Sequence, residues 1–175
     1  MDYKLRYQTH HDWRSIASEK FALDYIGIND VLYEEDDLIL RYAPLGIKTP
    51  EVVARDPTNP QRIISVEVKR ICGNTLPLEN GHRRKLKNRN VIIWPWTQTV
   101  YQSLEKANKK IVHELGIHRH HVVFVVPRSL EKRVLNRLVS RIESTTENYM
   151  HRIQLPVRHV VIHVIQGDDT LFDRF

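Results

Sequence analysis

The sequence predicts an α/β protein with a mixed central β-sheet flanked by helices. Two strand-like segments flank residues 56–60, whose prolines and asparagine predict a tight reversal and hence an antiparallel hairpin. From about residue 97 onwards, helix-like and strand-like segments alternate, which requires crossover connections and therefore parallel strands. The 175 residues contain no internal repeat and no Gly/Ser-rich linker, so we expect a single domain over residues 1–175.

The first half of the chain is expected to contain one helix and three strands. A helix over Asp12–Ile26 begins at a capping residue and ends at Gly27, because glycine tolerates the left-handed conformation of a helix stop. The apolar residues 38–43 predict the first strand. Residues 51–54 and 63–69 predict the two strands of the hairpin.

The second half is expected to alternate helices and strands. A helix begins at Thr97 and ends before Gly116. A strand over Val122–Val126, a helix from Ser129 and a strand over Val157–Ile165 follow it. The apolar stripe of the first of these helices consists of Val100, Leu104, Ala107, Ile111 and Leu115.

The composition limits the classes of protein to which the chain can belong. With 27 Lys and Arg against 21 Asp and Glu, the net charge is +6, which favours a polyanionic partner and nucleic acid first. The single cysteine, Cys72, excludes an intramolecular disulfide and a four-cysteine zinc site. The N-terminus lacks the apolar core of a signal peptide, and no apolar run approaches the roughly 20 residues of a membrane span. We therefore expect a soluble, cytoplasmic protein that binds no membrane.

The second strand of the hairpin places a carboxylate and an ammonium group on one face. Ser65, Glu67 and Lys69 alternate there with aliphatic residues that face the other way. If the turn centres near residues 58–59, residue 51 lies across from about residue 66 or 67. Directly opposed residues have Cβ atoms roughly 4.5–5.5 Å apart, so Glu51 and Glu67 can face each other. Two carboxylates at that distance repel unless a cation lies between them, and such a pair suits Mg²⁺. An isolated E-x-K pattern is otherwise typical of a solvated, salt-bridged face.

Asp56 is the alternative to Glu51 as the first acid of the site. The hairpin argues against it, because Asp56 belongs to the turn and would pair near Gln61. That position lies some six residues along the strand from Glu67, or roughly 20 Å away. We therefore interpret Asp56 as a turn residue that hydrogen-bonds its own backbone.

Pro50-Glu51 and Glu67-Val68-Lys69 resemble the P-(D/E)…(D/E)-x-K signature of the PD-(D/E)xK nuclease superfamily, which includes restriction endonucleases and Holliday-junction resolvases. The core order of that superfamily, α-β-β-β-α-β, is similar to the order predicted over residues 12–126. One difference is that the first acid is Glu, where Asp is commoner. The resemblance implies a restriction-endonuclease-like core with an added helix and strand.

The resemblance also implies roles for individual residues. Glu51, Glu67 and the backbone carbonyl of Val68 would hold a divalent metal, normally Mg²⁺, for which Mn²⁺ can substitute. Lys69 would orient the attacking water and stabilise negative charge on the phosphate. Many relatives add an acid from the first helix, which Glu19 matches by position, although a residue at the edge of the apolar face is an equal alternative.

Two further sets of residues have open interpretations. Gln98 and Tyr101 match a Gln and a Tyr that some recombination-type relatives carry on the helix after the third strand, although an exposed first-turn glutamine is the simpler interpretation. The acidic run of residues 34–37 could bind a cation, and we interpret it as a solvated strand end.

Basic residues gather in the sequence that follows the E-x-K strand. Positively charged loops suit phosphate contacts whose strength falls with salt, although most charge runs are only solvated surface. Because this run follows the nuclease-like strand, we expect DNA contacts there. The expected DNA-binding residues are Arg70, His82, Arg83, Arg84, Lys85, Lys87 and Arg89.

The sequence thus predicts a metal-dependent DNA endonuclease that hydrolyses phosphodiester bonds, of the restriction, junction-resolving or repair type. Its expected partner is duplex or branched DNA. Because cutting both strands requires two sites, we expect a homodimer. The alternatives are a non-catalytic nucleic-acid-binding module of the same fold, an RNA-processing nuclease, and a small α/β interaction domain.

Overall fold

The computed structural model describes residues 13–71, 99–155 and 159–172 of the chain. Within these ranges, none of the helices is both long enough and apolar enough to cross a membrane. Residues 99–104 form a short helical segment. The other elements, in chain order, are α2 (Trp13–Ile26), β1 (Val31–Glu34), α3 (Glu35–Tyr42), η1 (Ala43–Leu45), β2 (Val52–Asp56), β3 (Asn59–Arg70), α6 (Lys109–Leu115), β4 (Ile117–Pro127), α7 (Lys132–Ile153), β5 (Val160–Gly167) and η3 (Asp169–Leu171).

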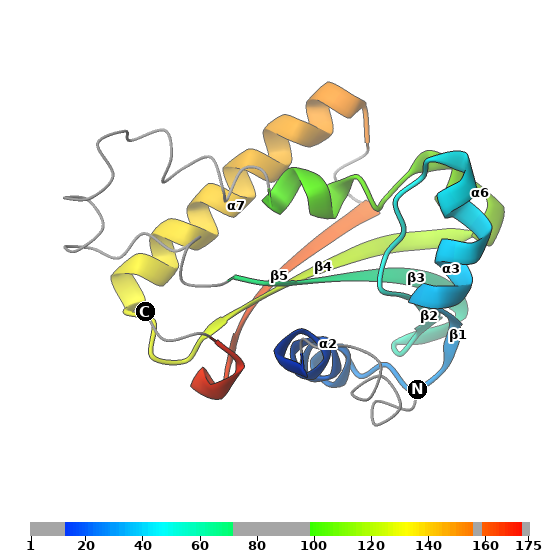
Figure 1. Cartoon of the computed structure of the whole chain (residues 1–175). Coiled ribbons are helices and arrows are strands. Elements are labelled where there is room, and N and C mark those ends of the chain that lie inside the picture. Colours follow the sequence, from blue (N-terminus) through cyan, green and yellow to red (C-terminus); the bar gives the residue numbers. More distant parts are fainter. Residues whose placement is uncertain (1–12, 72–98, 156–158, 173–175) are drawn as a thin grey trace.

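The strands form a mixed sheet, as predicted. In the part of the chain that the structure describes, five strands lie in the order β1-β2-β3-β4-β5 (Figure 1). β1, β2 and β3 pair antiparallel, which confirms the hairpin. β4 pairs parallel to β3, and β5 pairs parallel to β4, which confirms the crossover connections of the second half.

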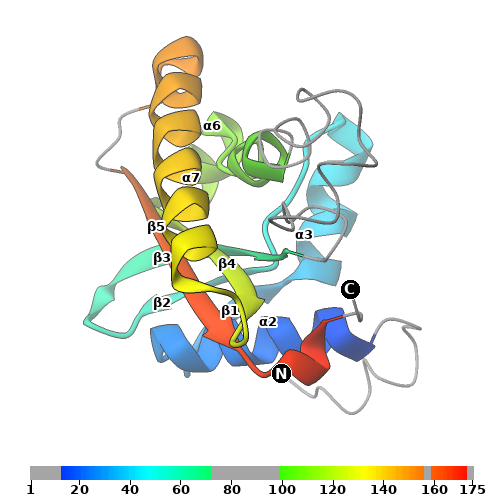
Figure 2. The ribbon, with the colours of Figure 1, turned by 90° about the vertical axis from the view of Figure 1, so that its left-hand side faces the viewer.

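Helices cover both faces of the sheet (Figures 1 and 2). α2 packs on one face, where Leu23 clusters with Val66 of β3. Residues 99–104 and α7 pack on the other face, where Leu138 clusters with Phe124 of β4. α3 and α6 extend this second layer over β2. β3 and β4 are therefore buried on both sides, so a polar side chain in the middle of β3 has no direct path to water.

Residues 38–43 form a helix and the start of η1, and the strand predicted there is wrong. Leu38 and Tyr42 lie one helical turn apart and are both fully buried, whereas Leu40 is 78% exposed. Three acids in the first turn of α3 and Arg41 in the last turn complement the helix dipole. The apolar run satisfied a strand pattern, but the charges around it favour a helix. The first strand is β1, and α3 is inserted between β1 and β2, where the predicted core order has no helix.

The helix predicted from Thr97 to Leu115 is two helices joined at residues 105–108, and Thr97 itself lies outside the described residues. The predicted apolar stripe is confirmed, because its five members are all buried. The side chain of Asn108 accepts a hydrogen bond from the backbone N–H of Lys110 at 2.9 Å and so caps α6. An internal cap interrupts the helix without interrupting its apolar periodicity, which is why the break was not predicted.

The remaining predicted elements are confirmed with shifted ends. α2 ends where predicted, and Gly27 adopts the left-handed conformation with φ +87°. α7 begins at Lys132, three residues after the predicted start at Ser129, because an isolated turn precedes it. β4 extends beyond its predicted residues at both ends, whereas β5 begins at Val160 and ends at Gly167, two residues after the predicted Ile165.

A pair of leucine substitutions tests the helical assignment of α3. Leu38→Ala should lower the free energy of unfolding by about 2–5 kcal/mol because it leaves a cavity in the core. Leu40→Ala should change it by less than about 0.5 kcal/mol because Leu40 is exposed. Urea denaturation measures both values. In a strand, residues 38 and 40 would share one face, so equal effects of the two substitutions would contradict the helix.

Candidate active site

The register between β2 and β3 brings Glu51 next to Glu67. Val52 pairs with Val66, and the backbone N–H of Glu51 donates to the Val66 carbonyl at 3.0 Å. Glu51 therefore stands across from residue 67, one of the two positions that the predicted turn allowed, and the register shifts between Arg55 and Asp56 next to the turn. The charge of Glu67 is close enough to affect the pKa of Glu51.

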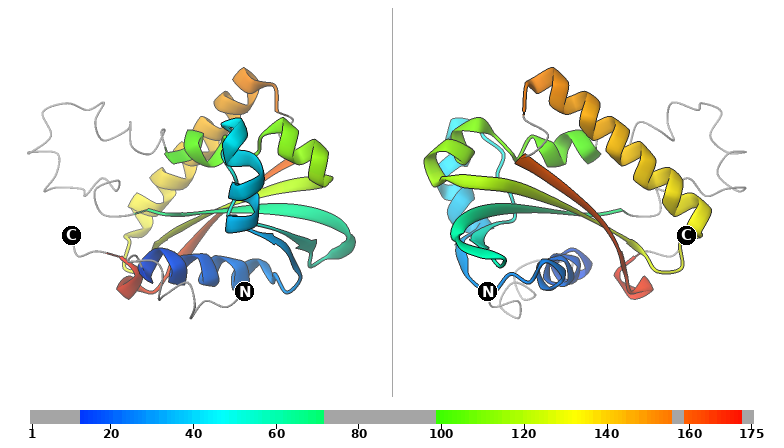
Figure 3. Two further views of the ribbon diagram at one scale, coloured as in Figure 1. Left: turned by 45° about the vertical axis from the view of Figure 1, so that its right-hand side comes forward. Right: turned by 180° about the vertical axis from the view of Figure 1, so that it is seen from behind.

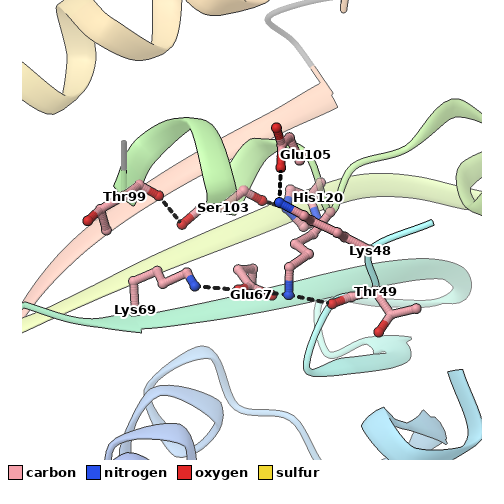
Figure 4. A network of polar contacts seen from close by, with 9 residues as sticks. Lys48, Thr49, Glu67, Lys69, Thr99, Ser103, Glu105 and His120 are labelled. Carbon is pink, nitrogen blue, oxygen red and sulfur yellow. Dashed lines mark hydrogen bonds and ion pairs between the residues drawn. The ribbon is translucent and has the colours of Figure 1, made fainter. Parts of the chain in front are cut away.

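Side chains along β3 alternate between the two faces of the sheet, and this alternation decides which face holds the site. Ser65, Glu67 and Lys69 lie in register with His120, Val122 and Phe124 of the parallel strand β4. Val122 and Phe124 pack under residues 99–104 and α7, so Glu67 and Lys69 point toward that layer. Figure 4 shows Glu67 and Lys69 between β3 and the helical segment above it.

Glu67 is fully buried, with 0% of its surface exposed, and it pairs with two lysines. Its Oε1 lies 3.4 Å from Nζ of Lys69 and 3.5 Å from Nζ of Lys106. Among the described residues, neither Glu67 oxygen has a hydrogen-bond partner of good geometry. Nζ of Lys106 donates to the Thr49 carbonyl at 2.8 Å instead. The carboxylate is thus stabilised by the charges of the two lysines, and its oxygens remain available for further ligands.

The positive charge near Glu51 and Glu67 is too small to keep the pKa values of the two carboxyl groups in their usual range. Burial raises the pKa of Glu67 to about 7, against the opposing effect of Lys106 and Lys69. Burial also raises the pKa of Glu51 well above its usual range, and the charges of Glu67, Glu35 and Glu19 raise it further. A divalent cation beside these oxygens would relieve both effects.

A buried Ser–His link holds the helical segment above the site (Figure 4). Burial lowers the pKa of His120 to about 4, so its ring is neutral. His120 Nε2 lies 3.4 Å from the Ser103 carbonyl, and Nδ1 lies 2.7 Å from Ser65 Oγ. With the proton on Nε2, the ring donates to Ser103 and accepts from Ser65. The two His120 contacts tie residues 99–104 to β3 and β4. Within that segment, Ser103 Oγ donates to the Thr99 carbonyl at 2.8 Å.

Lys106 and Glu35 lie next to this site. The sequence did not single out Lys106, and it offered Glu35 only as part of the acidic run of residues 34–37. Lys106 lies in the break at residues 105–108, so its position depends on the interruption that Asn108 causes. No short motif links it to Glu67. Glu35, in the run interpreted as a solvated strand end, is half-buried in the first turn of α3. Acidic residues ahead of an apolar run were a usable signal for that turn.

An open cleft of about 460 Å³ leads to the lysines. One side, built by α3, η1 and the residue that follows Gly46, contributes Ile39, Ala43 and Ile47. Lys69 comes from β3 and Lys106 from the helix break, and Glu35, Lys48, Thr49 and Gln102 also line the cleft. Lys48 forms an ion pair with Glu105 on the same segment as Lys106. The cleft therefore combines an apolar side with a set of lysines next to Glu67.

The structure brings some other predicted residues close to the site and places others elsewhere. Glu19 is buried on α2 and close enough to raise the pKa of Glu51. Arg70 lies one residue past Lys69, and its guanidinium donates to the Leu171 carbonyl at 2.8 Å, outside the lining of the cleft. The side chain of Val68 packs in the cluster on the α2 face.

The structure also describes Asp56 and Tyr101, two residues with alternative interpretations in the sequence. Asp56 Oδ1 accepts hydrogen bonds from the backbone and the hydroxyl of Thr58 at 2.9 and 2.7 Å, which confirms that it is a turn residue. Tyr101 is half-buried against Tyr149, with ring centroids 4.6 Å apart. Gln98 and the expected DNA-binding residues His82, Arg83, Arg84, Lys85, Lys87 and Arg89 lie outside the described residues.

Within residues 13–71, 99–155 and 159–172, no group of three or more His, Cys, Asp or Glu side chains is arranged to hold a metal ion. The candidate metal ligands are two carboxylates, those of Glu51 and Glu67. A pair suits a cation that keeps several waters and takes its remaining ligands from substrate phosphate, as Mg²⁺ does. The unbonded oxygens of Glu67 fit that requirement.

Replacing Glu67 by Gln should stabilise the fold at neutral and higher pH. The raised pKa means that the folded protein keeps a proton which the unfolded chain loses above its ordinary pKa of 4.5. The stability of the wild type therefore falls as the pH rises from about 4.5 to about 7, whereas the amide stays neutral. The advantage of E67Q should grow across this window to at most about 3 kcal/mol, at about 1.4 kcal/mol per unit of pKa shift.

Urea denaturation between pH 4 and pH 8 measures this difference. Glu105→Gln is the control for the loss of one negative charge, because Glu105 is an exposed carboxylate on the same side of the sheet. A difference between E67Q and the wild type that stays constant over the window would show that Glu67 is ionised throughout.

Comparison with known proteins returned no relative. No protein-family model matches this chain, no curated protein is significantly similar to its sequence, and no solved structure is significantly similar to its fold. What the chain does is therefore argued from its own residues.

Proposed function

We propose that this protein is a metal-dependent endodeoxyribonuclease. The observation that supports this most directly is the pairing of Glu51 with Glu67 across the β2–β3 hairpin, with Lys69 on the same face. In that arrangement, the residues that resemble the two parts of the P-(D/E)…(D/E)-x-K signature lie next to each other. The restriction-endonuclease-like core, which the order of strands from β1 to β4 supports, is part of the same proposal.

Glu51 and Glu67 would hold the metal, with the Val68 carbonyl as a further ligand. The fit rests on one buried and one partly buried carboxylate whose charges are not fully balanced, and on the free lone pairs of Glu67. When Mg²⁺ is bound in such a site, it neutralises charge at the scissile phosphate and lowers the pKa of a bound water. Glu19 would support Glu51 from α2 as an outer acid.

The two lysines would bind the phosphate. Both ammonium groups already lie within 3.5 Å of Oε1 of Glu67, so a phosphate oxygen beside that carboxylate comes within their reach. Lys69 would orient the attacking water and hold a non-bridging phosphate oxygen. Lys106 would hold a second oxygen, at an angle fixed by its hydrogen bond to the Thr49 carbonyl. Glu67 and the lysines thus position nucleophile and phosphate before the reaction starts.

DNA is the proposed substrate, and a homodimer is the proposed assembly for cutting both strands. The net charge of +6 supports a polyanionic partner. A non-catalytic nucleic-acid-binding module is the second candidate. It is favoured by the ion pairs that Glu67 makes with Lys69 and Lys106, because these pairs compensate the carboxylate without a metal.

A cleavage assay separates the candidates. Wild-type protein with Mg²⁺ should cut plasmid, a four-way junction or both into discrete products. Glu67→Gln and Lys69→Met should each lower the rate by at least about 100-fold because each removes a group that acts on the phosphate. Glu143→Gln, which removes an exposed carboxylate of α7, should cut like the wild type. DNA binding that falls with salt but is not accompanied by cleavage would favour the binding module, and faster cleavage of a matched RNA would favour the RNA-processing nuclease.

The rate of cleavage should also depend on the pKa of Glu67. Metal binding requires the ionised carboxylate, so protonation near pH 7 competes with the metal. At subsaturating Mg²⁺, the rate should fall about tenfold per pH unit below about pH 7, and higher Mg²⁺ should move this fall to lower pH. Rates measured from pH 5 to 8.5 at two Mg²⁺ concentrations test this. A profile that is the same at both concentrations would contradict Glu67 as a ligand.

A further inference from the structure

We propose that the cleft admits a nucleotide whose base is unpaired, so that the preferred substrate is DNA with interrupted base pairing, such as a fork, flap, bubble or junction. The base would lie on the apolar side of the cleft, formed by Ile39, Ala43 and Ile47 and here named the α3 wall. The phosphate would lie on Lys69 and Lys106. This inference rests on the proposed nuclease function and specifies its substrate.

The α3 wall sets an apolar surface beside a cationic one. Ile39 is 42% exposed, although it lines the same cleft as Lys69 and Lys106. The outside of a paired duplex offers phosphate and sugar to such a cleft, while the faces of its bases are covered by their neighbours. A nucleotide that has left the stack offers an anionic group and an uncovered apolar face together. This combination matches the two sides of the cleft.

The depth of Glu67 leads to the same substrate. Its carboxylate is fully buried and does not line the cleft, whereas Lys69 and Lys106, which pair with it, do. A phosphate therefore approaches Glu67 through the two lysines, and the open cleft of about 460 Å³ has the size of a small-molecule site, enough for one nucleotide. Taking a nucleotide out of a duplex costs unstacking and unpairing free energy, and the cost is least where the base is already unpaired. The cleft therefore selects against fully paired DNA.

The elements next to the α3 wall continue its apolar surface. Leu40 on α3 and Leu45 on η1 are 78% and 56% exposed. Aliphatic side chains of this kind can wedge between bases and unstack them. Figure 3 shows α3 on the same side of the sheet as the helical segment at residues 99–104. Because α3 is an insertion between β1 and β2, this surface is additional to the strands that position the carboxylates.

Matched substrates test the proposal directly. One 40-base-pair duplex is compared with the same duplex carrying a three-nucleotide bubble, and kcat/KM is measured for each with Mg²⁺. The bubble should be cut at least about tenfold faster. Ile39→Ser should reduce this preference severalfold because it removes the apolar contact of the base. Tyr25→Ser, which removes an exposed ring on α2, is the matched control and should leave the preference unchanged. Equal or faster cleavage of the paired duplex would overturn the proposal.

A binding measurement decides the proposal even if no DNA is cut. The same bubble carries 2-aminopurine at its centre, and its fluorescence is measured on addition of E67Q without metal. A change in fluorescence that saturates for E67Q and is lost in E67Q combined with Ile39→Ser would support the α3 wall as the base site. An unchanged signal during salt-sensitive binding would overturn it. A dimer by sedimentation that Leu40→Ser dissociates would also overturn it, because a second copy of the chain would then cover this surface.

Discussion

The burial of Glu67 in the middle of β3 is the constraint on which the rest of the site depends. A carboxylate without solvent contact is costly unless cations approach it, and here Lys69 and Lys106 lie 3.4 and 3.5 Å away. The sheet causes this burial, because β3 pairs on both edges and carries helices on both faces. The raised pKa of Glu67 shows that the two lysines do not fully offset the loss of solvent. A bound metal ion, as proposed, would offset the remaining imbalance.

The lysines reach Glu67 by different routes. Lys69 comes from the same strand, two residues further on, so the pleat of β3 sets its position. Lys106 depends on three tertiary features: the break before α6, the hydrogen bond to the Thr49 carbonyl, and the link from His120 to the segment that precedes the break. The candidate site therefore depends partly on the local geometry of β3 and partly on the packing of segments that are distant in the sequence.

The two sides of α3 differ in burial. Leu38 and Tyr42 are buried against α6 and β2 and fix the helix to the sheet. Ile39 and Leu40 face away from that core and leave an apolar surface beside the lysines of the cleft. Since a helix turns about 100° per residue, the short helix α3 can bury one side in the core and leave apolar side chains exposed on the other. A strand at the same residues would have placed Leu38 and Leu40 together on one side.

The sequence by itself determined the mixed sheet, the hairpin, and its register to within one residue, which brought Glu51 near Glu67, because turn residues and strand alternation are local properties. It also determined the buried stripe from Val100 to Leu115, because helical periodicity survives a break. Tertiary structure decided the rest. Lys106 and Glu35 approach Glu67 and Glu51 only when separate elements pack, and no spacing along the chain encodes that approach. The conformation of residues 38–43 was likewise settled by where Leu38 and Tyr42 could be buried together.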